Sequence, residues 1–330
     1  SISLYAKDIA EDEDLYIMGY VRAVLQSEFG IDTPVEVQRG RVYLPEMLED
    51  SLQYEAVKER IESIKGVSKV KFVPQKQIDT MSNTWFMPAD ALFRPLLGDP
   101  KWSRFSAGYH YYTKDVNYKH AFDGVFGKNL SILRFATMSD TLAEVGLQAS
   151  VFATFDLASD SFDLMNADYF VGIPVTLKHN DFSVIFRYYH QSSHLGDEYI
   201  KREPSVTRIN LSYETLDFIT SYDVNDNLRV YGGAGFVIRR NPSDFGRWHI
   251  QWGAELDISS DSLFIPITLL AIDMKSYEEA DFKPYISAKV GITMSNKGII
   301  TLDFYNGPSP HGQFYPDHVT WIGTSLSFYI

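Results

Sequence analysis

Two groups of residues in this chain of 330 residues carry side chains suited to catalysis or to metal binding. The first is His190 and Ser192, two positions apart in the segment DFSVIFRYYHQSS. Residues two apart on a strand share one face, so an imidazole and a hydroxyl come within reach of each other, as the base and nucleophile of a hydrolase require. The second group lies in two polar loops that follow, and its members are His194, Asp197, Glu198, His311 and Asp317.

Imidazoles and carboxylates of this second group, if they converge, would bind Ca²⁺ or a transition metal. Their spacing matches no standard metal-binding loop. The alternative is structural: Gly196, Gly307 and Gly312 make tight turns while the histidines cap and cross-link the loops. For His190 and Ser192 the corresponding alternative is hydrogen bonding to lipid headgroups and water.

The segment that carries His190 and Ser192 has the pattern of a strand with two different faces. One face is apolar and consists of Phe182, Val184, Phe186 and Tyr188. The opposite face consists of Ser183, Ile185, Arg187, Tyr189 and Gln191. This pattern favours a strand with lipid outside and a polar interior. His190 and Ser192 fall on the lipid-side parity, where the strand reaches the outer rim of the membrane.

The composition excludes several classes of function. The formal net charge of −13 argues against nucleic-acid binding, which needs a basic face. The absence of cysteine excludes disulfides and thiolate metal sites. No apolar run approaches the roughly 18 residues of a membrane-spanning helix. The strands of a transmembrane barrel alternate, so a barrel agrees with this composition.

Alternation with aromatic apolar faces recurs from residue 102 onward. It predicts about twelve strands, near 102–113, 129–138, 141–156, 167–178, 181–193, 206–222, 227–239, 247–258, 262–273, 282–294, 298–306 and 318–330. The predicted inner face is crowded with charges of both signs: Arg187, Arg208, Glu214, Arg229, Arg239, Arg247, Glu255, Lys283, Lys289 and Asp303. Such side chains would pair and narrow the lumen, so we expect an occluded or narrow barrel.

The first part of the chain has helical periodicity instead. It predicts a helix over 14–29, strands near 34–38 and 41–44, a helix over about 51–65 and a strand over 67–73. Four prolines and little periodicity mark a linker with an ordered patch at LFRPLLGDP. The predicted organisation is a small α+β domain at 1–73, a linker at 74–101, and a transmembrane antiparallel β-barrel at 102–330.

The order helix, two strands, helix, strand, with VEVQRGRVYL and IKGVSKVKFV, resembles the BON domain of bacterial envelope proteins over about residues 14–73. That family usually has a glycine after the second strand, where this chain has Pro45 and Glu46. The resemblance implies a periplasmic domain that binds phospholipid or a partner protein. A small packing module is the alternative.

The segments LFRPLLGDP, RYYHQSSHLGDEYI, YGGAGFVIRR and YNGPSPHGQFYPD resemble a bacterial family known as domain-of-unknown-function family 1207. Its most specific parts here are SSHLGDE and SPHGQFY. The resemblance covers about residues 85–330. It implies the outer membrane of a Gram-negative bacterium and supplies no activity.

A lipid-facing His-x-Ser near the outer rim is also similar to the arrangement in outer-membrane phospholipase A and in the lipid A deacylases. In those families an Asn or Glu further along, on the adjacent strand, orients the histidine. The resemblance implies Glu203 for that role, with Ser192 as nucleophile and His190 as base. Glu203 has the parity of Ile209 and Leu211, the predicted outward face of the next strand.

We therefore expect an outer-membrane barrel protein that contacts outer-membrane lipids, and whose N-terminal domain binds lipid or a periplasmic or envelope partner. Its expected role is binding or organisation in the envelope. One alternative is a lipid acyl hydrolase, an esterase or lipid deacylase, that uses Ser192 and His190. A second alternative is a narrow substrate-selective pore. Ca²⁺ is the cofactor that the loop residues suggest.

Overall fold

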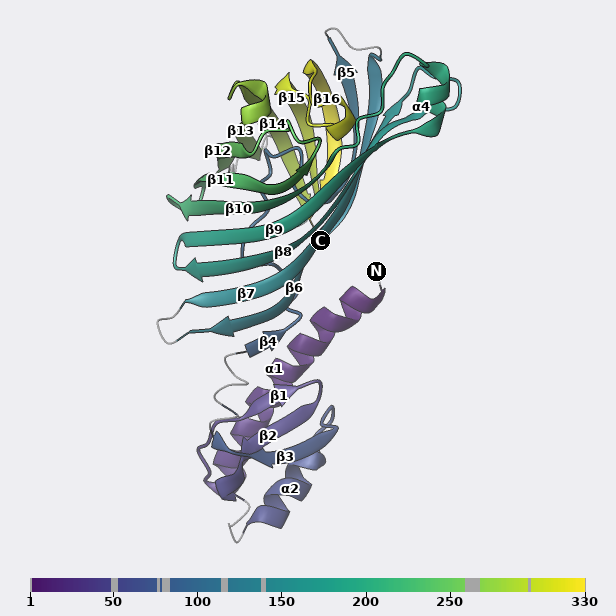
Figure 1. Cartoon of the computed structure of the whole chain (residues 1–330). Coiled ribbons are helices and arrows are strands. Elements are labelled where there is room, and N and C mark those ends of the chain that lie inside the picture. The colour runs from purple at the N-terminus through teal and green to yellow at the C-terminus, as the bar shows by residue number, and fades with distance from the viewer. Residues whose placement is uncertain are drawn as a thin grey trace. The chain divides into compact units, whose positions relative to one another are not determined.

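The computed structural model describes residues 2–48, 53–75, 78, 84–113, 118–137, 141–258, 268–295 and 298–329, with backbone alone for 2–12 and 295. It divides into two compact units, whose elements carry the labels of Figure 1. The first unit is Ser1–Ala89 with Leu133–Thr137. The second is Asp90–Ile132 with Met138–Ile330.

The N-terminal unit has the predicted order of elements: α1 (Ile2–Phe29), β1 (Glu36–Gln38), β2 (Arg41–Pro45), α2 (Tyr54–Glu62) and β3 (Lys69–Val73). The strand β2 pairs antiparallel with β1 and parallel with β3. The helix α1 begins before the predicted residue 14, and residues 51 and 52 of the second predicted helix lie outside the described residues. The core joins both helices to the sheet: Ile17, Val21, Val24, Leu25, Val35, Val37, Val42, Leu44, Val57, Ile61, Ile64 and Val70.

The turn between β1 and β2 requires a glycine. Gly40 has a φ of 72°, and a Cβ there would lie 2.5 Å from the carbonyl oxygen of Gly66. The Asp14 carboxylate accepts hydrogen bonds from the amides of Arg39 and Gly40, at 2.5 and 2.7 Å. These bonds hold the turn against α1.

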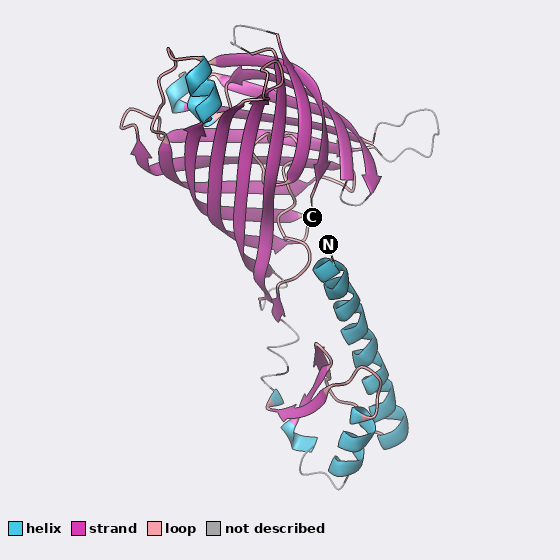
Figure 2. Cartoon of the chain, turned by 90° about the vertical axis from the view of Figure 1, so that its right-hand side faces the viewer, coloured by secondary structure: helices cyan, strands magenta, loops and turns pink. Residues whose placement is uncertain are grey.

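Twelve antiparallel strands form the second unit within the described residues: β5 (Phe105–Tyr112), β6 (His120–Ala136), β7 (Leu142–Asp156), β8 (Leu164–His179), β9 (Phe182–Leu195), β10 (Ser212–Asp223), β11 (Leu228–Asn241), β12 (Trp248–Asp257), β13 (Leu269–Tyr277), β14 (Pro284–Ser295), β15 (Gly298–Pro308) and β16 (His318–Phe328). Each strand pairs with its neighbours in sequence, and β16 pairs with β5. The sheet is therefore a closed barrel, as predicted, and Figure 2 shows its strands crossing the wall obliquely. A short strand, β4 (Thr84–Phe86), pairs with the end of β6.

Every predicted strand segment overlaps one observed strand, although several ends differ. The strand β6 begins earlier than predicted, at His120, and β10 begins later, at Ser212. Residues 262–267 of the segment predicted at 262–273 lie outside the described residues, as do residues 138 and 330. The two ends of the barrel differ. Short connections such as 180–181 and 224–227 mark the short-turn end, and longer ones such as 196–211 and 309–317 mark the long-loop end.

The outer face of the barrel is apolar. On β8 the side chains of Val171, Ile173, Val175 and Leu177 are exposed, and the residues between them are buried. An exposed apolar band on alternate residues is typical of a strand that faces lipid. Among the described helices, none combines the length and apolar character needed to cross a membrane.

The second half of the predicted linker lies inside the barrel, and we call residues 92–104 the plug. The Arg229 guanidinium donates hydrogen bonds to the carbonyls of Arg94 and Pro95, at 3.0 and 2.9 Å. The Ser287 hydroxyl donates to the carbonyl of Gly98, at 2.7 Å. The plug also has an apolar contact with the wall, made by Phe93, Leu96, Trp102, Ile185, Ile219 and Tyr231.

A second segment, the inner loop of residues 309–317, packs against the ends of β8 and β9. The Gln313 amide donates hydrogen bonds to the carbonyls of Ser193 and Ile209, both at 2.8 Å. Gly312 donates its amide to Asp168 Oδ2 at 3.1 Å. The plug and the inner loop therefore both lie inside the barrel wall.

Half of the charged residues predicted for the inner face are buried there: Arg187, Arg229, Glu255, Lys289 and Asp303. They form ion pairs with one another or with Asp217, at nitrogen–oxygen distances of 2.6 to 3.6 Å. The prediction was wrong for Glu214 and Arg239, which lie on the outer face. A β-bulge leaves Ile238 unpaired, so Arg239 pairs with Glu214 although Val237 points inward.

Candidate functional site

The strand β9 carries His190 and Ser192 on its outer face, near the long-loop end. Phe186 and Tyr188 precede them on the same face, and their exposed fractions are 43% and 40%. The side chain of His190 is 42% exposed. The residues between, such as Tyr189 and Gln191, are buried inside the barrel. The predicted parity of this strand is therefore the observed one.

Glu203 does not lie on the adjacent strand. It follows the last residue of α4 (Asp197–Arg202), and its amide donates a hydrogen bond to the carbonyl of Tyr199. The segment between Glu203 and Ser212 is not a strand. In this segment Ile209 and Leu211 pack inward against Val237 and Phe245. Their apolar character therefore marked a core contact and not an outward face, and the role predicted for Glu203 has no support in the geometry.

Glu214 occupies the position that Glu203 was expected to fill. It pairs with His190 in the register of β9 and β10, and its Oε1 lies 3.9 Å from His190 Nδ1. Arg239 is the second neighbour of this carboxylate, at 3.6 Å from Nη1. Reading the alternation backward from Leu216 and Phe218, which are apolar and share its parity, would have found Glu214 in the sequence.

This arrangement has the parts of a nucleophile–base–acid site. With Glu214 at Nδ1, the Nε2 atom of His190 is left for the Ser192 hydroxyl on the same face of the strand. Among the described residues, Ser192 Oγ makes no hydrogen bond to the ring. Such contacts are commonly loose before substrate binds.

Two further groups lie beside Ser192 toward the long-loop end. Tyr169 is its register partner on β8, and the Tyr169 ring meets the His194 ring edge-on, with centroids 5.7 Å apart. Arg208 Nη2 lies 3.1 Å from His194 Nδ1. The exposed guanidinium groups of Arg208 and Arg239 therefore both lie near His190 and Ser192.

The five residues predicted to bind a metal do not converge. His194 is exposed on the outer face, whereas His311 is buried in the lumen. Asp197 and Glu198 are exposed in the first turn of α4. The part of the chain that the structure describes contains no group of three or more His, Asp or Glu residues arranged to hold a metal ion.

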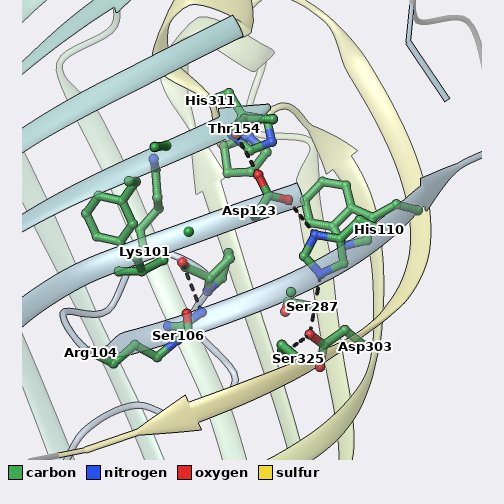
Figure 3. Close-up of a pocket in the computed structure, with 18 of the residues that line it drawn as sticks. Lys101, Arg104, Ser106, His110, Asp123, Thr154, Ser287, Asp303, His311 and Ser325 are labelled. Atoms are coloured by element: carbon green, nitrogen blue, oxygen red, sulfur yellow. Dashed lines mark hydrogen bonds and ion pairs between the residues drawn. The ribbon is translucent and has the colours of Figure 1, made fainter. Parts of the chain in front are cut away.

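His311 instead belongs to a polar network inside the barrel (Figure 3). Thr154 donates its hydroxyl proton to Asp123 at 2.6 Å, so it accepts from His311 Nδ1 at 3.0 Å. His311 Nε2 then accepts from the Tyr112 hydroxyl at 2.8 Å. Burial lowers the pKa of His311, which keeps this ring neutral.

The network continues across the lumen through His110. Figure 3 shows its ring between Asp123 and Asp303, which bond to Nδ1 and Nε2. Asp303 also receives Lys289 Nζ at 3.6 Å and the Ser325 hydroxyl at 2.5 Å. The residues of this part of the network belong to β5, β6, β14, β15 and β16, so their hydrogen bonds and ion pairs connect these strands across the interior.

A family model described as "Protein of unknown function (DUF1207)" matches residues 53–330. The chain belongs to this family. The match covers the whole barrel and begins just before α2, so it reaches further toward the N-terminus than the resemblance at 85–330. No match was found among the curated proteins.

Solved outer-membrane barrels are similar in fold. The outer membrane phospholipase (OMPLA) of Salmonella typhi, a dimer with bound calcium, is 11% identical with a TM-score of 0.50, over 69% of this chain and 90% of that one. The Escherichia coli outer membrane phospholipase A is 12% identical with a TM-score of 0.49, over 68% and 92%. The KdgM porin is 9% identical with a TM-score of 0.39, over 68% and 99%. At these identities the likeness concerns the fold alone, an outer-membrane-like β-barrel.

Proposed function

We propose that this protein is a lipid acyl hydrolase of the outer membrane. Ser192 is the nucleophile, His190 the general base, and Glu214 the acid that orients the imidazole. The observation that carries the proposal is the 3.9 Å approach of Glu214 Oε1 to His190 Nδ1 on the face that carries Ser192. The fold shared with a solved outer membrane phospholipase is compatible with this activity.

In the proposed reaction, the Ser192 hydroxyl attacks the carbonyl carbon of an acyl ester while His190 Nε2 takes its proton. The ester C–O bond then breaks, and the imidazolium returns the proton to the leaving alkoxide. Water, activated by the same base, cleaves the acyl-serine, releases a fatty acid and restores the hydroxyl. Glu214 accepts a hydrogen bond from the Nδ1–H group of His190 and stabilises the imidazolium.

The surroundings of the site favour a lipid substrate with a phosphate in its headgroup. The exposed rings of Phe186 and Tyr188 extend from His190 toward the short-turn end and offer apolar surface to an acyl chain. Arg208 and Arg239 lie toward the long-loop end, where guanidinium groups would meet the phosphate of a phospholipid or of lipopolysaccharide.

The test is acyl release by the purified full chain. It is mixed with vesicles of phosphatidylethanolamine and phosphatidylglycerol, or with lipopolysaccharide, with and without Ca²⁺. Ser192→Ala and His190→Ala should abolish the release of fatty acid. Ser212→Ala, at the register partner of Ser192 on the same outer face, is the matched control and should retain it. No release from either lipid, or equal release by Ser192→Ala, would overturn the proposal.

The N-terminal unit supports a second function, the binding of lipid or an envelope partner on the periplasmic side. The exposed face of α1 carries Leu15, Tyr16 and Tyr20, and the two tyrosine rings stack with centroids 6.4 Å apart. Exposed aromatic rings on a helix are suited to a membrane interface or a protein partner. The test uses the full chain with its barrel already held in lipid nanodiscs, mixed with protein-free vesicles. Equal co-flotation of the wild type and of the double variant Tyr16→Ser, Tyr20→Ser would refute the lipid role.

A pore function is the least supported of the three. Carbonyl groups of the plug accept hydrogen bonds from Arg229 and Ser287, and the inner loop lies against β8 and β9. A barrel filled in this way should give no steady current in a planar bilayer. A steady single-channel conductance would favour the pore.

A further inference from the structure

A cavity of about 80 Å³ lies in the long-loop half of the lumen and contains no part of the His190–Ser192 site. Its walls include Tyr189, Gln191, Tyr213, Lys275 and Glu279, and we call it the Lys275 cavity. At about 10–15 Å³ of such volume per water molecule, it has room for roughly six water-sized groups. Residues of the connections before β12, β14 and β16 also line it, so it lies beneath the long loops.

Lys275 is a buried cation without a carboxylate partner. It is 7% exposed, and no described Asp or Glu oxygen lies within ion-pair distance of its ammonium group. Its ammonium group lies 5.3 Å from the centroid of the Tyr277 ring. The other cations of the cavity are paired: Lys101 with Asp168, and Arg187 with Asp217. Burying an unpaired charge is unfavourable, so a negative group near Lys275 would be strongly favoured.

Two further polar side chains of the cavity lack partners. Gln191 is 7% exposed, and neither its amide nor the hydroxyl of Tyr213 makes a hydrogen bond to a described residue. Both line the same cavity as Lys275. The ammonium, amide and hydroxyl groups of these three residues face the cavity, so a ligand with several acceptor oxygens would take hydrogen bonds from all of them.

The carboxylates of the cavity leave Lys275 available. Asp99 accepts hydrogen bonds on both oxygens, from the Lys101 amide at 2.7 Å and the Gln251 side chain at 3.0 Å. Glu279 belongs to the short helix Glu278–Ala280 between β13 and β14, and burial raises its pKa to about 7. His249 is engaged by Asp217 at 2.9 Å. Asp99 and Glu279 are therefore the carboxylates lining this cavity that oppose an anion, and neither lies within ion-pair distance of Lys275.

The rest of the wall is aromatic. Tyr213 stacks on Phe245 with centroids 5.0 Å apart and meets Tyr189 edge-on. Such a wall packs against the flat faces of a ring. We propose that the Lys275 cavity binds a small organic anion, with its acidic oxygens on Lys275 and Gln191 and its ring against Tyr213.

The test is calorimetric titration of the full chain in detergent with benzoate and with glucuronate. Their uncharged counterparts, benzyl alcohol and glucose, and inorganic phosphate are titrated in parallel. At least one acid should bind, at least about tenfold more tightly than its counterpart and than phosphate, since a hydrogen bond to a charged group is involved. Failure of both acids, or equal affinity for an acid and its counterpart, would overturn the proposal. Phosphate that binds as tightly as the acids would overturn the role of the ring.

Variants locate the binding. Lys275→Met should weaken the acid about tenfold or more, and Glu279→Gln should strengthen it at pH 8, where the native carboxylate repels an anion. Lys283→Met, which removes an exposed lysine, is the control and should change nothing. Lys275→Gln replaces Lys275→Met if that variant does not fold, as judged by the gel mobility of the unheated barrel. Unchanged affinity in the Lys275 variant would refute the site, and Ser192→Ala should bind normally, so the hydrolase is tested separately.

Discussion

Glu214 and His190 face each other across β10 and β9 on the outer surface of the barrel, with Oε1 3.9 Å from Nδ1. The same carboxylate lies 3.6 Å from Arg239, which the bulge at Ile238 turns to the outside. Ser192 lies two residues further along β9, on the same outer face as His190. The outer surface therefore carries an acid, a base and a hydroxyl on two neighbouring strands.

Glu214→Gln should lower kcat for acyl release by about 10²-fold or more, because the neutral amide no longer stabilises the imidazolium. The measurement is the initial rate of fatty acid release from phosphatidylglycerol vesicles. Glu203→Gln is the control and should keep the wild-type rate, since Glu203 lies at the end of α4. A loss of rate in Glu203→Gln, with Glu214→Gln unaffected, would restore the original assignment.

Arg239→Gln should raise KM for phosphatidylglycerol about two- to fivefold, the size expected for one exposed ion pair. The effect should shrink as salt is added, because exposed charges are screened. The KM for an uncharged triacylglycerol ester should stay the same. Lys283→Gln, at another exposed cation, serves as the control. An equal change for charged and uncharged esters would argue against contact with the headgroup.

Trp102→Ala should destabilise the barrel by about 3–5 kcal/mol, the range for removing a large buried aromatic side chain. Trp102 is 1% exposed, and its ring stacks on Phe93 beneath the Arg187 guanidinium. Urea unfolding followed by gel mobility measures the loss. Trp85→Ala removes a tryptophan that is 42% exposed and should change little. If the two variants were equally stable, the plug would contribute nothing to barrel stability.

Glu279 should make barrel stability depend on pH. Burial raises its folded pKa from 4.5 to about 7, so its ionised form is disfavoured in the folded state. The penalty is absent below the unfolded pKa, grows between about pH 4.5 and 7, and is complete above that range. Glu279→Gln should therefore match the wild type at pH 4 and exceed its midpoint of thermal unfolding at pH 8. A difference between the two that is constant with pH would contradict this.

Prediction from sequence succeeded where the signal was local. Phe182, Val184, Phe186 and Tyr188 alternate with buried residues in β9 as their spacing predicts, because successive side chains of a strand always point to opposite faces. The same rule failed at Ile209 and Leu211, whose alternation belongs to a packed loop. Alternation alone does not distinguish a strand from a loop folded over apolar residues.

The spacing of apolar and polar residues along the chain was enough to predict a transmembrane antiparallel barrel of about twelve strands and the outward face that carries His190 and Ser192. These features follow from the alternation of side chains along each strand, which is a local property of the sequence. The pairing of strands in the folded barrel was needed to find that Glu214 neighbours His190 and that Arg239 lies beside it on the outer face. Pairing register and the bulge at Ile238 come from contacts between strands. The fold was also needed to place residues 92–104 in the lumen, because their partners, such as Arg229 and Ser287, are distant in the chain.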